Sequence, residues 1–175
     1  MKTYKLITLI ILVLFVSCKE ENTELPKVEF NFDEISKNKN DGENVYVNDL
    51  EKIFTKEEKE NLEKYLDNLE KNKKIKILIL TIPSKNISEE EWETTSSFAT
   101  NGIIINFSKS MKKIDIASDT DMTKILTKDI KDSIVTNTII PNFNKDNYYI
   151  GIKKGLLEII SILDKEGNVW GNVSD

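Results

Sequence analysis

The chain has 175 residues, 39% of them hydrophobic, and a formal net charge of −5. This length suits one domain with an ordinary core and is too short for two large ones. Histidine is absent and every basic residue is lysine. These absences exclude Ser-His and Cys-His catalytic pairs, imidazole metal ligands and the bidentate phosphate contacts of arginine. The excess of acidic residues argues against a nucleic acid as partner.

Residues 1–17 are predicted to be a signal peptide. A short basic region is followed by apolar residues at 6–16, which are too few to span a bilayer comfortably. Cys18, the only cysteine, follows Ser17 and resembles the lipobox cysteine of bacterial lipoproteins. The residue at Phe15 departs from the leucine usual in that motif. We expect cleavage before Cys18 and lipid attachment to it; the alternative is a signal anchor with an incidental cysteine.

Residues 18–43 are predicted to be a lipidated tether, because they contain too few apolar residues to offset the entropy of ordering. Apolar residues alternate at 28–32, which leaves a short strand as an alternative there. The run Lys-Glu-Glu at 19–21 resembles the signal that carries Bacteroidetes lipoproteins to the cell surface. This run predicts an outer-membrane lipoprotein whose domain is exposed at the cell surface. If the run is only the charged start of the tether, the domain is expected to face the periplasm.

A folded domain is predicted over residues 44–165, followed by a polar tail over 166–175. Its first strand is expected at 45–47, just before Asn48-Asp49. A capping box opens residues 55–72, whose apolar side chains recur at helical spacing. Residues 75–82 are almost wholly apolar and are followed by a proline, which predicts a central strand buried on both faces.

A second capping box, Ser88-Glu89-Glu90-Glu91, predicts a short helix that carries Trp92. Asn101-Gly102 then precedes an apolar strand at 103–107, and residues 114–117 alternate as a half-exposed strand does. A four-residue connection between these strands predicts an antiparallel pair.

Two further helical regions complete the domain. Apolar residues at helical spacing mark residues 122–134, and Pro141 is expected to stop that region. The last helix is expected from Tyr149 to Leu163, with Leu156 in the middle of its apolar stripe. The predicted fold is therefore α/β: a mixed, Rossmann-like sheet of about four strands sandwiched between helices.

Five features occur in order along residues 45–163. They are Asp49 after the first strand, the strand at 75–82, Asn101-Gly102 before an apolar strand, Lys112-Lys113 at the hairpin return, and Asp146-Asn147-Tyr148 with Gly151 opening the last helix. In this order they resemble the TPM domain, a small α/β module of thylakoid-lumen, bacterial-envelope and receptor-accessory proteins. The resemblance implies the TPM fold and, because some TPM domains bind calcium, a candidate Ca²⁺ site.

The metal ligands implied in this way are Asp49, Asn101, Asp121 and Asp146, placed where strands end and helices begin. Each has a plainer alternative: Asp49 as a turn cap, Asn101 as the residue that enters the turn with Gly102, and Asp146 as a helix N-cap. The family's usual acids are also replaced at Thr100, Thr123 and Lys128. Calcium binding is therefore expected to be weak at most.

Two functions follow from the resemblance. The first is a non-catalytic, membrane-tethered module that binds or helps to assemble an envelope protein, whose identity the sequence does not give. The second is a metal-assisted acid phosphatase acting on phosphomonoesters through Asp49 and nearby acids, because one branch of the family has been described as a phosphatase. Without arginine or histidine, the means of neutralising charge during phosphoryl transfer are few, which favours the binding module.

Overall fold

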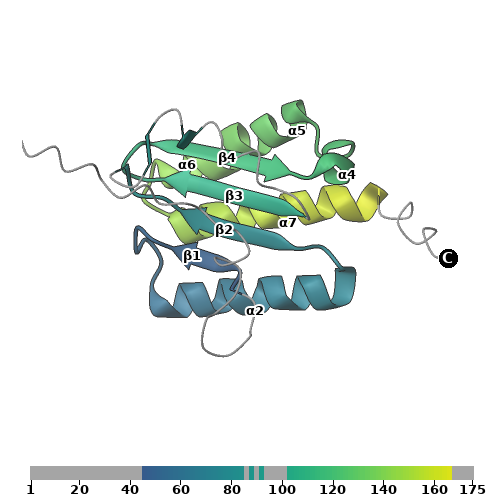
Figure 1. The fold of residues 1–175 in the computed structure, drawn as a ribbon, viewed down its shortest axis with the longest axis horizontal. Helices are drawn as coiled ribbons and strands as arrows, with labels where there is room; N and C mark the ends of the chain where they lie inside the picture. Colours follow the sequence, from purple (N-terminus) through teal and green to yellow (C-terminus); the bar gives the residue numbers. More distant parts are fainter. Residues whose placement is uncertain (1–44, 85–86, 89–90, 93–101, 167–175) are drawn as a thin grey trace, which may run out of the picture.

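A computed structural model describes the domain between the predicted tether and the tail (Figure 1). The described residues are 45–84, 87–88, 91–92 and 102–166. The signal peptide, the tether with Cys18, and Asn101 lie outside them. Within the described part of the chain, no helix is both long enough and apolar enough to cross a membrane.

Four strands form one mixed sheet in the order β1-β2-β3-β4. Their bounds are Val47–Asp49 for β1, Ile77–Thr81 for β2, Ile103–Ser108 for β3 and Lys113–Ser118 for β4. The first three strands run parallel, and β4 pairs with β3 antiparallel through a four-residue turn. The predicted four-stranded mixed sheet and its hairpin are both confirmed.

The first strand lies two residues later than predicted. The N–H of Ile79 donates to the Tyr46 carbonyl at 2.7 Å, and the paired residues then run from Val47 to Asp49. The N–H groups of Tyr46 and Val47 are both bound by the carboxylate of Glu63, which lies in the following helix. A side chain of α2 therefore binds the backbone N–H groups where the strand begins.

Helix α2 spans Lys56–Lys73 and confirms the predicted capping box. The Thr55 hydroxyl accepts from the Glu58 N–H at 3.2 Å, while the Glu58 carboxylate accepts from the Thr55 N–H at 2.8 Å. The helix ends at Lys74, whose left-handed backbone (φ 59°) brings its N–H to the Glu70 carbonyl. Local sequence signals therefore determine both ends of this helix.

The helical region after β4 departs from prediction at Pro141. It consists of α4 (Thr120–Thr123), α5 (Lys128–Ser133), the π-helix η3 (Ile134–Ile139) and α6 (Ile140–Phe143). Pro141 does not stop it, because the bonding pattern changes at Ile140 and the proline falls in the first turn of α6. A first-turn residue has no N–H bond to lose.

Helix α7, Tyr148–Glu166, is the last described element. Leu156 is fully buried in its middle, as predicted, together with Ile152, Ile159 and Leu163 on the same stripe. Two glycines let α7 approach the neighbouring helices closely. A Cβ at Gly151 would lie 2.8 Å from the Phe143 ring, and one at Gly155 would lie 2.7 Å from Ile139.

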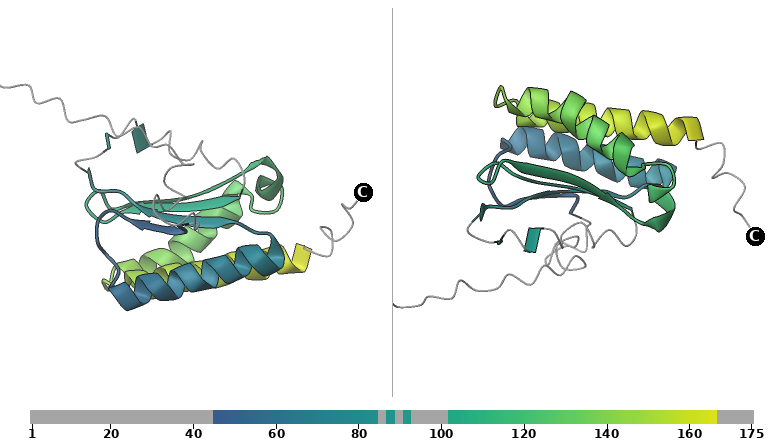
Figure 2. Two further views of the ribbon diagram at one scale, coloured as in Figure 1. Left: turned by 60° about the horizontal axis from the view of Figure 1, so that its bottom comes forward. Right: turned by 90° about the horizontal axis from the view of Figure 1, so that it is seen from above.

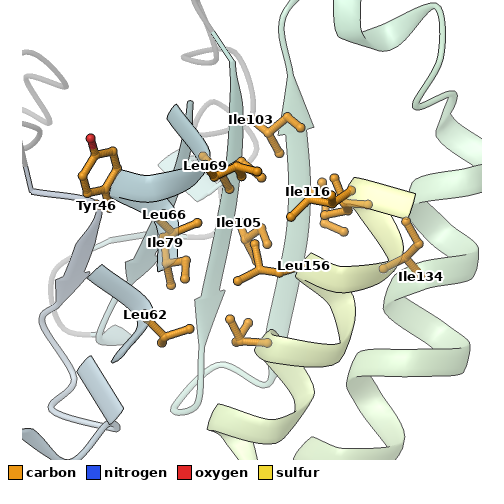
Figure 3. Packing of buried hydrophobic residues seen from close by; sticks show 14 of the residues in the cluster. Tyr46, Leu62, Leu66, Leu69, Ile79, Ile103, Ile105, Ile116, Ile134 and Leu156 are labelled. Atoms are coloured by element: carbon orange, nitrogen blue, oxygen red, sulfur yellow. The ribbon is translucent and has the colours of Figure 1, made fainter. Parts of the chain in front are cut away.

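The described long helices lie on one face of the sheet (Figure 2). Leucines of α2, isoleucines of β2 and β3, and residues of η3 and α7 form the main core (Figure 3). On the second face, Leu80 and Ile82 pack with Ile87 and Trp92 in a separate cluster. The Ser88–Glu91 capping box is present, with both of its backbone bonds made. Much of the segment that connects β2 with β3 lies outside the described residues.

Candidate functional site

The carboxyl ends of the three parallel strands meet the β3–β4 turn, and several hydrogen bonds between distant segments occur there. The paired register places Asp49 of β1 beside Thr81 of β2, and Thr81 beside Phe107 of β3. The turn that follows Ser108 begins at Lys109 and lies at the same end. In open α/β sheets this end is the usual location of a ligand site.

The Asp49 carboxylate is held entirely by neighbouring protein groups. One oxygen accepts from the Thr81 hydroxyl at 2.7 Å and from the Ile53 N–H at 3.0 Å. The other accepts from the Phe54 N–H at 2.9 Å. Asp49 therefore closes the loop between β1 and α2 and positions the helix start. This is the turn-capping alternative, strengthened by a bond to a second strand.

Glu51 is a site residue that the sequence reasoning missed. Its carboxylate accepts from the Lys109 N–H at 2.6 Å, the Ser110 N–H at 3.1 Å and the Ser110 hydroxyl at 2.7 Å. The Glu51 N–H in turn donates to the Thr81 hydroxyl at 2.9 Å. Glu51 thus clamps the β3–β4 turn to the β1–α2 loop. Because the partners are 58 and 59 residues apart, no local pattern could have indicated them.

Asp146 lies at this end but is not the N-cap of α7. Its N–H donates to Phe143 O and the next N–H donates to Asn142 O, and its φ is 57°. These bonds form a Schellman motif that ends α6, with Asp146 as the left-handed residue. Its exposed carboxylate lies 3.3 Å from the Lys109 ammonium.

The Lys109 ammonium connects Asp146 with an aromatic group. It lies 4.8 Å from the centre of the Tyr148 ring, which stacks on Phe107. The hydrogen bond to Asp146 and the phenol of Tyr148 raise the pKa of Lys109 above its usual value. The ammonium is half exposed and already paired, so it is a poor candidate for a free anion-binding group.

Asp121 lies at the opposite end of the sheet. Because β4 runs antiparallel to β3, its last residue, Ser118, pairs with the first residue of β3, Ile103. Asp119 then caps α4 by accepting from the N–H groups of Asp121 and Met122 at 3.1 and 2.8 Å. Asp121 itself is exposed and forms an ion pair with a lysine one turn later, at 2.8 Å.

The four predicted ligands therefore do not converge. Asp49 and Asp146 lie at one end of β3, and Asp121 lies at the other; five strand steps separate these ends by roughly 16 Å. Asn101 is outside the described residues, but the adjacent Gly102 lies at the Asp121 end. Ligands of one calcium ion all lie within roughly 2.6 Å of it. One ion cannot bind both Asp49 and Asp121.

The acids at the carboxyl end do not fit calcium as they stand. A carboxylate has about four lone-pair positions, and Asp49 and Glu51 each use three of them on protein donors. Among the described residues, no three histidine, cysteine or acidic side chains gather at metal-binding spacing. A calcium ion at Asp49 would have to displace the bonds that hold the β1–α2 loop.

Two of the solved structures that resemble this chain share its fold. The N-terminal domain of a P. gingivalis protein is 18% identical with a TM-score of 0.59, over 70% of this chain and 83% of that one. The BA42 protein of the psychrophilic bacterium Bizionia argentinensis is 20% identical with a TM-score of 0.54, over 66% of this chain and 85% of that one. At these identities the likeness is one of fold.

The search of curated proteins finds no match to this chain. The family model of the TPM domain, in contrast, matches residues 47–162. This range starts at the first residue of β1 and ends within α7, so it contains the whole described sheet, helix α2 and most of α7. The chain belongs to the TPM domain family.

Proposed function

We propose that this protein is a non-catalytic TPM module that binds or helps to assemble a protein of the cell envelope, held at the membrane by a lipid on Cys18. The observation that carries the non-catalytic part is the engagement of Asp49. Its carboxylate, the group on which a metal-assisted reaction would depend, accepts three bonds that hold a loop and a neighbouring strand together.

The hydroxyl groups at the carboxyl end of the strands also support a non-catalytic role. Thr81 donates to Asp49 and Ser110 donates to Glu51, each at 2.7 Å, which is the spacing of a nucleophile and its base. Thr81 is fully buried, however, and cannot reach a substrate. The Glu51 carboxylate that faces Ser110 also accepts from two backbone N–H groups of the β3–β4 turn, so it is already in use as a structural clamp.

Phosphomonoester hydrolysis tests this proposal against the phosphatase alternative. Turnover of a generic phosphomonoester is measured with and without divalent metal, for the wild type, Asp49→Asn and Ser110→Ala. We expect no turnover above the buffer rate for any of them. Metal-dependent turnover that is lost in either variant, with the fold retained by circular dichroism, would establish the phosphatase and remove the binding-module proposal.

Membrane attachment has its own test. Mass spectrometry of the protein from membranes should find a mature chain that begins with lipid-modified Cys18. Cys18→Ser should prevent that processing. The variant chain should carry no lipid, whether it is released from the membrane or stays there. Normal processing and membrane retention of the serine variant would contradict lipidation at this position.

Calcium binding is proposed to be weak. A ligand that binds only the folded state raises stability by mass action, so thermal unfolding of the wild type should change only when calcium reaches roughly 10⁻⁴–10⁻³ M, the range of extracellular modules. A shift of the unfolding midpoint at micromolar calcium would show a better site than the acids at the carboxyl end can supply in their present arrangement.

A further inference from the structure

The β1 edge of the sheet is closed in an unusual way. The Ile79 N–H donates to the Tyr46 carbonyl, so the carbonyl of Tyr46 faces β2. Alternation along a strand then directs the N–H of the next residue, Val47, away from the sheet. That outward N–H donates to one oxygen of Glu63 at 3.0 Å, and the Tyr46 N–H donates to the other at 2.9 Å. One carboxylate of α2 therefore occupies the position of a further strand.

The rest of this edge is also occupied. Asp49 is the next residue after Val47 whose backbone faces outward, and its carbonyl accepts from the Lys52 N–H at 3.3 Å. Glu63 is fixed in place because its helix packs directly on β1: Leu62 and Val47 are buried in the same core. The edge is thus only three residues long and carries a cap at its first residue.

The opposite edge is protected by different means. The Ile103 N–H faces β2, so alternation and the β3–β4 register direct the backbone of Ile116 outward from β4. Ile116 is nevertheless only 1% exposed, and Lys131 of α5 reaches the last residue of β4, Ser118. Helices α5 and η3 cover that edge. In the described structure, the carboxylate of Glu63 therefore has the role at β1 that two helices have at β4.

The cap does not maximise stability. Burial raises the pKa of Glu63 above its usual value, and the nearby charge of Asp67 acts in the same direction, even though two backbone N–H groups and Lys59 lower it. The ionised carboxylate is therefore less favourable in the folded protein than in water. A residue retained at such a cost is typical of devices that prevent unwanted strand pairing.

We propose that the Glu63 carboxylate closes the β1 edge against addition of a further strand, the competing strand being β1 of a second copy of this chain. Two identical edges can pair about a two-fold axis, because each offers the same N–H and C=O groups to the other. In the absence of the cap, the outward N–H of Val47 is the group that would start this pairing.

The test compares Glu63→Ala with Glu60→Ala, a control on the exposed side of the same helix whose carboxylate only approaches Lys56, at 3.8 Å. Amide hydrogen exchange and sedimentation velocity are measured over a concentration series, with circular dichroism to confirm the fold. For dilute Glu63→Ala we expect the Val47 amide to exchange at least about tenfold faster than in the wild type, since a bond to a charged acceptor is lost.

At high concentration, Glu63→Ala should sediment as a larger species and its Val47 amide should become protected again, whereas Glu60→Ala should match the wild type. Association without renewed protection of Val47, or a folded variant that stays monomeric, would overturn the proposal. If the alanine variant does not fold, Glu63→Gln decides. This variant keeps the side-chain length and one acceptor oxygen. We therefore expect the Tyr46 or Val47 amide to exchange faster than in the wild type, and self-association to be weaker than that expected of Glu63→Ala but present. Wild-type behaviour in both measurements would overturn the proposal.

Discussion

At the carboxyl end of β1, β2 and β3, the acids Asp49 and Glu51 turn inward, and each accepts three hydrogen bonds from distant or neighbouring segments. At the opposite end, Asp121 points to solvent and pairs with one nearby lysine. The two ends therefore use the same chemical group for different purposes. An acid near a strand end is a ligand candidate only if its oxygens are free and other ligands lie beside it.

The largest loss of stability is expected from a change in the hydrophobic core, which lies between the two ends of the sheet and supports both. Leu156 is fully buried against the sheet, so Leu156→Ala should lower the free energy of unfolding by about 2–5 kcal/mol. Denaturant unfolding measures this. Leu157→Ala, at the exposed neighbouring position, is the matched control and should change stability by less than about 0.5 kcal/mol. Similar values for both variants would mean that α7 is packed differently.

The comparison itself is tested by removing one acid from each end. Asp49→Ala should cost about 2–3 kcal/mol, because three donors lose a charged acceptor. Asp121→Ala should change the free energy of unfolding by less than about 0.5 kcal/mol, as at other surface sites. Urea unfolding of the two variants side by side is sufficient, and equal losses would remove the distinction between the ends.

A smaller effect is expected at Asp146, which lies at the carboxyl end without taking part in its clamps. Its φ of 57° suits glycine better than alanine. Asp146→Gly should therefore remain within about 0.5 kcal/mol of the wild type, whereas Asp146→Ala should lose about 1 kcal/mol. Thermal unfolding of both variants distinguishes backbone conformation from carboxylate chemistry, because both variants lack the acid. Equal losses would point to the carboxylate.

The smallest expected effect is a pH dependence of the free energy of unfolding that comes from Glu63. Its pKa is raised above the usual 4.5 in the folded protein, so the folded state binds more protons than the unfolded state just above pH 4.5. Stability from this group is therefore lost as pH rises through that window and is unaffected below it. Relative to Glu63→Gln, which does not titrate, the wild type should become less stable as pH rises from 4.5. The opposite slope would mean that the two N–H bonds outweigh burial.

Much of the fold followed from local sequence signals. The capping box at Thr55 and Glu58 determined the start of α2, and alternation with a four-residue connection determined the β3–β4 hairpin. Pro141 misled the prediction because a proline stops a helix only where an N–H bond would be needed. A change from π to α bonding just before it is not visible in the sequence.

The candidate site was predicted less well, for two physical reasons. The antiparallel direction of β4 carries Asp121 away from Asp49, which reading the acids in chain order did not take into account. The bonds that occupy Asp49 and Glu51 come from backbone groups and from residues up to 59 positions away. A sequence pattern shows that an acid is present, but not that its oxygens are already in use.

The central claim is that Asp49 is a loop anchor rather than a metal ligand. The most direct measurement is the free energy of unfolding of the wild type and Asp49→Ala, each in chelator and in millimolar calcium. The account predicts that Asp49→Ala costs the same about 2–3 kcal/mol in both solutions, because its three hydrogen bonds do not depend on metal. A cost that is small in chelator and grows as calcium is added would contradict it, since that is the behaviour of a lost calcium ligand.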